Sequence, residues 1–188
     1  MNTEDRRNRL VAWLEVIKED VQDLMYDHYV FWEVQDILRA NPKASSASGL
    51  FNQWMASSFI QSAAVGVRRQ AKANDDSVSL KRFLKEVRQF PELVSRDVYL
   101  AFFAASPAWL TESNGIGYFD SLAGPGGPHI QTSVVDQQMA ELDAAVNSVE
   151  HYVDRRIAHY DKRGLAKPVP TFKDLEGALK ALESGMSH

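Results

Sequence analysis

One run of apolar residues near the C-terminal end constrains the fold of this chain most strongly. Between Val135 and Val153 such residues recur every three or four positions, as Val135, Met139, Leu142, Val146, Val149 and Val153. This spacing places them on one side of an α-helix, where they can face a core. The series continues into Arg156 and Tyr160, so the last two turns of this helix, before the expected stop at Gly164, are polar and basic.

Helical periodicity extends over most of the remaining sequence, and no stretch shows the alternation that is typical of a strand. We expect helices from Thr3 to about Leu38, from Ser46 or Ser48 to about Asn74, from Ser77 or Ser79 to just before Pro91, from Ser95 to Ala105, and after Thr171. Thr3, Thr171, and either Thr132 or Ser133 are the expected N-caps. Glycines and prolines predict a long irregular loop over residues 106–131. The predicted fold is an all-α helical bundle in a single domain, residues 1–188.

Composition narrows the function classes. The 188 residues are 45% hydrophobic and 24% charged, as in ordinary globular domains, and the absence of cysteine excludes disulfides and thiolate zinc sites. We therefore expect a cytoplasmic protein, and the charged N-terminus predicts no signal peptide. The uncharged stretch between Lys43 and Arg68 is too polar for a membrane span, so we expect a buried helix there. A net charge of −4 means that contact with nucleic acid would need a local basic patch.

The basic end of the long helix is the best candidate for chemistry. At about 100° per residue, Tyr152, Arg156, His159 and Arg163 lie on one flank, with Arg155 beside them. A guanidinium group binds phosphate through two parallel hydrogen bonds, and histidine can transfer protons near neutral pH. The flank could therefore bind or cleave a phosphodiester. Alternatively, these residues only complement the helix dipole and form surface pairs with acidic neighbours.

Other chemistries find little support in the sequence. His151 and His159 are eight residues apart, and neither a His-Glu-x-x-His nor a Glu-x-x-His pattern occurs, so we expect no metal site and no cofactor. His28 falls on the apolar stripe of the first helix, where we expect a core histidine that bonds to a neighbouring side chain.

Two segments of the chain resemble the HEPN superfamily, in particular its AbiU-type abortive-infection branch. Residues 153–161, Val-Asp-Arg-Arg-Ile-Ala-His-Tyr-Asp, resemble the end of the long helix in that superfamily. Residues 65–70, Val-Gly-Val-Arg-Arg-Gln, followed by residues 75–84, Asp-Asp-Ser-Val-Ser-Leu-Lys-Arg-Phe-Leu, resemble an earlier segment of the same branch. Together the two segments span about half of the chain, from Val65 to Asp161.

This resemblance implies a helical bundle that forms a homodimer and acts in phage defence, with a cognate antitoxin as a further partner. Family members cleave or bind RNA without a metal, using an arginine and a histidine separated by four to six residues on one helix. His159 matches the family histidine, whereas the matching arginine positions hold Tyr152, Val153 and Asp154.

The nearest arginines, Arg155 and Arg156, lie closer to His159 than the family pattern has them. Two interpretations follow. The first is an RNA-directed protein, either an endoribonuclease that uses His159, Arg156 and Arg155 or an RNA binder that uses Arg155, Arg156, Arg163 and Tyr152. The second is a catalytically silent, dimeric interaction protein.

Overall fold

The structure is a computed structural model that describes residues 2–43, 49–104, 112–154 and 170–186. Its helices are α1 (Thr3–Ala40), α3 (Gly49–Ala71), α4 (Leu80–Gln89), the short 3₁₀ helix η1 (Pro91–Leu93), α5 (Arg96–Ala104), α6 (Glu112–Ala123), α7 (Thr132–Tyr152) and α8 (Phe172–Met186). Within these residues the β-structure is limited to one isolated antiparallel bridge between Ser95 and His129. The predicted all-α fold is confirmed.

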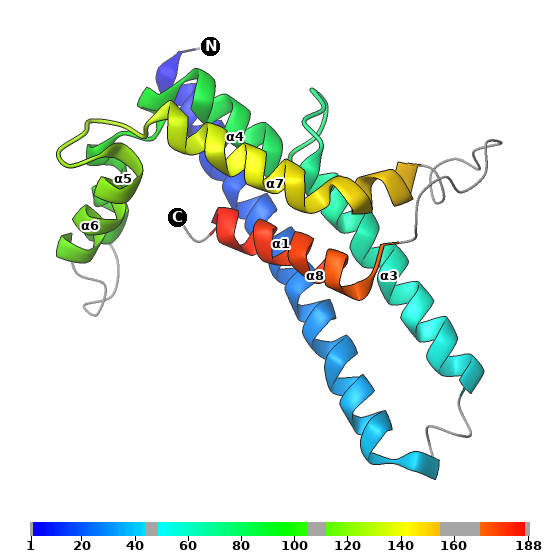
Figure 1. Cartoon of the computed structure of the whole chain (residues 1–188). Coiled ribbons are helices and arrows are strands. Elements are labelled where there is room, and N and C mark those ends of the chain that lie inside the picture. The colour runs from blue at the N-terminus through cyan, green and yellow to red at the C-terminus, as the bar shows by residue number, and fades with distance from the viewer. Residues whose placement is uncertain (1, 44–48, 105–111, 155–169, 187–188) are drawn as a thin grey trace.

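The two longest helices determine the shape of the molecule. α1 and α3 form a hairpin, and α7 and α8 cross the half of it that lies nearer the chain termini (Figure 1). α4 packs beside α7 and against α1, whereas α5 and α6 form a pair set to one side of the bundle. The other half of the hairpin extends beyond α7 and α8.

The apolar stripe of α7 lies at the centre of the core, as the sequence predicted. Its members Val135, Leu142, Val146, Val149 and Val153 are buried, and Met139 is half-buried against the same cluster. They pack with buried residues of α3, α4 and α8. Burying one such side chain contributes about 1.5–3 kcal/mol, so this stripe is a main source of the free energy of folding.

A close crossing joins α1 to α3. A Cβ atom added at Gly66 of α3 would lie 2.4 Å from Cδ2 of Leu24 on α1, so the two helices approach as closely as a glycine allows. Ala63 and Ala64 on the same part of α3 are also buried. The small residues of α3 therefore permit the two helices to pack closely at this point.

The helix N-termini were predicted only in part. The Oγ of Ser79 accepts a hydrogen bond from the backbone nitrogen of Arg82 at 3.2 Å, and Thr171 and Asp174 cap each other at the start of α8. Both caps agree with the prediction. The predictions of Thr3 and of Thr132 or Ser133 are wrong, because Asn2 caps α1 and the chain enters α7 without a side-chain cap.

The predicted loop over residues 106–131 is wrong for residues 112–123, which form α6. Phe119, Leu122 and Ala123 are buried and stand three and four residues apart, which is helical spacing. Their burial outweighs the low helix propensity of the glycines in this segment. Residues 124–131 are irregular as predicted, with positive φ angles at Gly124 and Gly126, and residues 105–111 lie outside the described part of the chain.

Arg96 of α5 links the α5–α6 pair to the irregular segment of residues 124–131. The guanidinium of Arg96 donates to Oδ1 of Asp120 at 2.5 Å and to the carbonyl oxygen of Gly127 at 2.9 Å. The Arg96 hydrogen bond, followed by one from the backbone of Gly126, lowers the pKa of Asp120. Asp120 therefore stays ionised and holds the pair in place at neutral pH.

Candidate functional site

The basic flank predicted from the sequence is described only at its start. His159, Arg155, Arg156 and Arg163 lie outside the described residues, and Tyr152 is half-buried against the core cluster. Beyond Tyr152, residues Val153 and Asp154 continue the helix with the wider π-helical turn. Such turns are rare and frequently occur at functional sites.

Ion pairs fix this end of α7 against α3. Nε of Arg68 donates to Oδ1 of Asp154 at 2.5 Å, and Nζ of Lys72 lies 3.2 Å from Oε1 of Glu150 and 3.8 Å from Oδ2 of Asp154. The groups are partly exposed, so each pair contributes no more than about 1 kcal/mol. Two cations face two anions, so Arg68 and Lys72 add no net positive charge at the start of the basic flank.

A groove between the α5–α6 pair and the bundle contains two adjoining cavities. The first, which we call the apolar chamber, has a volume of about 370 Å³ and is bounded by parts of α1, α4, η1, α5, α7 and α8. Its walls are mostly aliphatic and include Leu10, Leu14, Leu84, Val87, Leu93 and Val135. Among the described residues that line the chamber, only Arg7 and Glu15 are charged.

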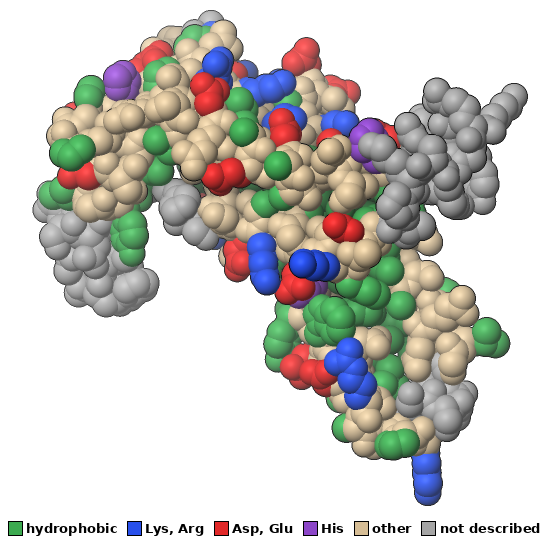
Figure 2. All heavy atoms as spheres, viewed as in Figure 1, with side chains coloured by type: hydrophobic (Ala, Val, Ile, Leu, Met, Phe, Trp, Pro, Cys, Tyr) green, Lys and Arg blue, Asp and Glu red, His purple; other side chains and the backbone are tan. Residues whose placement is uncertain are grey.

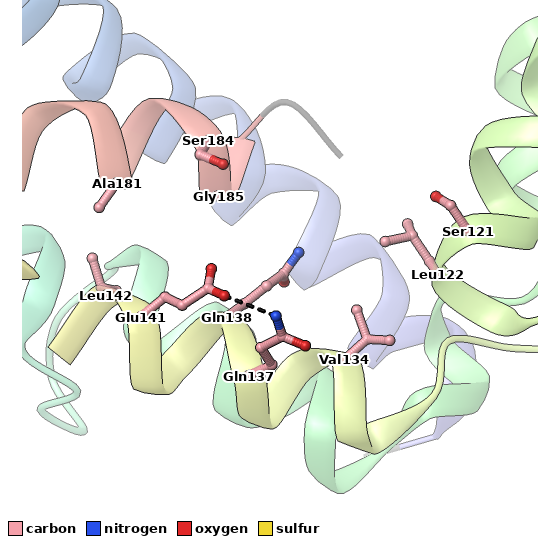
Figure 3. Close-up of a pocket in the computed structure, with 10 residues that line it drawn as sticks. All are labelled: Ser121, Leu122, Val134, Gln137, Gln138, Glu141, Leu142, Ala181, Ser184 and Gly185. Atoms are coloured by element: carbon pink, nitrogen blue, oxygen red, sulfur yellow. Dashed lines mark hydrogen bonds between the residues drawn. The ribbon is translucent and has the colours of Figure 1, made fainter. Parts of the chain in front are cut away.

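The second cavity, which we call the vestibule, has a volume of about 330 Å³ and a more polar wall. Gln137, Gln138 and Glu141 of α7 lie opposite Ser184 of α8, with Ser121 of α6 at the far side (Figure 3). Nε2 of Gln137 donates to Oε1 of Glu141 at 2.8 Å. The vestibule and the apolar chamber share the wall residues Leu122, Gln138 and Gly185, so they form one groove with a polar and an apolar part.

Arginines and aromatic rings alternate between α1 and α4, in a set that we call the arginine–aromatic ladder. Cζ of Arg6 lies 4.0 Å from the ring centroid of Phe90, and those of Arg9 and Arg82 lie 4.9 and 4.7 Å from the Trp13 centroid. Glu86 pairs with both Arg6 and Arg9, at 3.3 and 2.5 Å. The ladder therefore holds three cations and one anion. Sequence reasoning missed it, although the spacing of Arg6, Arg9 and Trp13 places them near one another on a helix.

The far end of the α1–α3 hairpin exposes large apolar side chains. We call residues 32–40 of α1 and 49–58 of α3 the hairpin tip. There Leu50 is 85% exposed, Trp54 is 64% exposed, and Ile37 and Phe51 are also exposed. Figure 2 shows hydrophobic side chains on the surface of this part of the molecule. The predicted buried helix between Lys43 and Arg68 is thus wrong for the first half of α3, because α7 and α8 cover only the second half.

The described residues offer no group of three or more histidine, aspartate or glutamate side chains that could hold a metal ion. His28 is half-buried, and its Nε2 accepts a hydrogen bond from Nε1 of Trp32 at 3.0 Å, as expected for a core histidine that bonds to a neighbour. None of the described helices has the length and apolar character needed to span a membrane.

No family model, curated protein or solved structure matches the chain. The structure shows an all-α helical bundle. Because no comparison tests it, the resemblance to the HEPN superfamily stays a prediction. The groove, the ladder and the hairpin tip are the three surfaces from which a function can be argued.

Proposed function

We propose that this chain is a helical interaction protein that self-associates through the hairpin tip. The observation that carries this proposal is the exposure of Ile37, Leu50, Phe51 and Trp54 at one end of the molecule. Full burial of one such side chain contributes about 1.5–3 kcal/mol. Monomeric soluble proteins rarely leave large apolar side chains grouped in this way, and such a patch usually marks an interface.

The charges of the hairpin tip favour a second copy as the partner. Asp36 and Arg39 pair with each other at 2.7 Å, and the nearby Glu33 and Lys43 also cancel in charge. Two identical tips would therefore meet without net repulsion. Two helical hairpins that pack tip to tip around a twofold axis would bury their apolar faces as a four-helix arrangement.

Light scattering tests this proposal. We expect the wild-type protein at tens of micromolar to have about twice the chain mass of 21.1 kDa. Replacing both Leu50 and Trp54 by Ser should give a monomer with unchanged helical content. The matched control is Val16→Ser, which removes an exposed valine of α1 outside the tip and should leave the dimer intact. A monomeric wild type, or a dimer that survives the double substitution, would refute the proposal.

The arginine–aromatic ladder favours RNA as a second candidate function. Arg6 and Arg9 share one carboxylate, Glu86, and Arg82 lies over the same Trp13 ring as Arg9, so this surface carries a local surplus of positive charge on a chain whose net charge is −4. Arginine binds phosphate bidentately, and its flat guanidinium can stack on bases. Arg82 also belongs to one of the two segments that resemble the HEPN superfamily.

In this second function the chain would bind RNA, or cleave it without a metal through His159 together with Arg155 or Arg156. It would then act in phage defence, with a cognate antitoxin as a further partner. The ladder and the π-helical turn that leads toward residues 155–163 support this candidate, which is compatible with self-association at the hairpin tip.

A further inference from the structure

We propose that the apolar chamber binds a small amphiphilic carboxylate, whose apolar chain fills the chamber and whose carboxylate bonds to Arg7. This inference goes beyond self-association and RNA binding, because the chamber is not part of the hairpin tip and Arg7 is not one of the ladder's arginines.

The chamber has the size and lining of a ligand site. Its volume of about 370 Å³ falls in the range of small-molecule pockets, about 300–1,000 Å³. Leucine and valine side chains from α1, α4, η1 and α7 converge on it, and no polar side chain other than Arg7, Glu15, Gln138 and Tyr99 enters from the described residues. An alkyl chain is therefore the ligand group whose burial against this wall would be most favourable.

Arg7 differs from the two arginines beside it. Arg6 and Arg9 share the carboxylate of Glu86, whereas Arg7 projects toward the chamber, where its Nε donates to the carbonyl oxygen of Leu93 at 3.3 Å. Among the described residues Arg7 has no carboxylate partner. A half-buried guanidinium without a counter-ion favours an anion, and its remaining N–H groups can bind a carboxylate bidentately.

The charges around the groove favour a carboxylate over an amine as the head group. Glu15 stands eight residues after Arg7, about 12 Å along the helix, and is exposed. Glu141 in the vestibule is also exposed and already accepts a hydrogen bond from Gln137. An ammonium group would therefore meet solvated carboxylates, whereas a carboxylate would meet a half-buried cation beside an apolar wall.

Calorimetric titration with decanoic acid, below its micellar concentration, tests the proposal. We expect saturable binding of one decanoate per chain and at least tenfold weaker binding of decylamine. Arg7→Gln should weaken decanoate binding at least tenfold, whereas Arg7→Lys, which keeps the charge but loses the bidentate geometry, should weaken it less than Arg7→Gln does. The matched control is Arg88→Gln, which changes an exposed arginine of α4 outside the chamber and should bind decanoate as the wild type does.

A second variant fills the chamber and leaves the charge of Arg7 unchanged. Val11 lines the chamber and is partly exposed, so Val11→Trp should fill the space without disturbing the core and should abolish decanoate binding. Circular dichroism reports whether each variant keeps its helices. If Arg7→Gln fails to fold, Val11→Trp and the comparison of decanoate with decylamine still test the proposal. The proposal would be overturned if decanoate did not bind saturably or if decylamine bound as tightly as decanoate. It would also be overturned if Val11→Trp bound decanoate as tightly as the wild type.

Discussion

Gln70 on α3 accepts a hydrogen bond at Oε1 from the backbone nitrogen of Leu80, 2.8 Å away at the start of α4. The Nε2 of the same amide donates to the carboxylate of Asp20 on α1. Gln70 is 2% exposed, so one buried side chain joins three helices by hydrogen bonds. The Leu80 N–H has no partner within its own helix, because it belongs to the first turn.

We expect Gln70→Leu to lower the free energy of unfolding by about 1–3 kcal/mol, because it leaves a buried N–H without an acceptor and removes a donor from Asp20. Urea denaturation monitored by circular dichroism measures the effect. Gln61→Leu on the exposed side of α3 is the control and should change stability by less than about 0.5 kcal/mol. Equal stability of the two variants would show that Gln70 does not tie the helices together.

The cap of α8 should depend on pH. The backbone N–H of Thr171, followed by its hydroxyl, bonds to Asp174 and lowers the pKa of that carboxyl group. Because the pKa is lower in the folded than in the unfolded state, the carboxylate stabilises the fold above about pH 4. This stabilisation is lost as the pH falls through the lower, folded-state pKa.

Asp174→Ala should therefore lower the melting temperature at pH 7, and the difference from wild type should shrink at about pH 3 and below. The control is Asp75→Ala, which removes an exposed carboxylate between α3 and α4 and should change the melting temperature little at either pH. A difference between Asp174→Ala and wild type that is independent of pH would contradict this account of the cap.

Two glycines should respond to alanine in opposite directions. A Cβ atom at Gly127 would lie 2.2 Å from the backbone carbonyl oxygen of Ala123, so Gly127→Ala should distort the turn and destabilise the fold. Gly177 lies on the exposed side of α8 with nothing within 4 Å of an added Cβ. Gly177→Ala should stabilise the protein by about 0.5–1 kcal/mol, because alanine favours a helix interior. Thermal unfolding of both variants should show a lower melting temperature for Gly127→Ala and a higher one for Gly177→Ala.

If the chain binds RNA, its affinity should fall with salt, because each neutralised phosphate releases counterions. For a single strand the slope of log affinity against log salt is about −0.7 per contact. Arg156→Ala and Arg82→Gln should each make the slope less steep by about 0.7 per protomer. His159→Ala should leave binding nearly unchanged and abolish any cleavage, because a proton carrier acts mainly in the transition state. Binding that is undetectable or independent of salt would remove RNA as a candidate.

The fold could be predicted because its main signals are local. The stripe from Val135 to Val153 and the caps at Ser79 and Thr171 depend on residues within a few turns of one another. α6 was missed because its glycines suggest a loop, whereas the burial of Phe119 depends on tertiary contacts with Arg96 and Tyr99 of α5, which the sequence of α6 does not reveal.

The candidate sites depend on such distant contacts even more. Arg68 meets Asp154 across 86 residues, and Arg9 meets Glu86 across 77. The apolar chamber collects side chains from segments between Arg7 and Met186. No spacing rule brings residues so far apart together, so the sequence could indicate the basic flank and the α1 part of the ladder but not the groove or the ladder's contacts with α4.

α1 contains no glycine or proline between Thr3 and Ala40, so nothing in its sequence provides a joint. It carries Arg7 beside the chamber and Ile37 at the hairpin tip, 30 residues and about 45 Å further along the same rod. One uninterrupted helix therefore contributes side chains both to the wall of the chamber and to the hairpin tip.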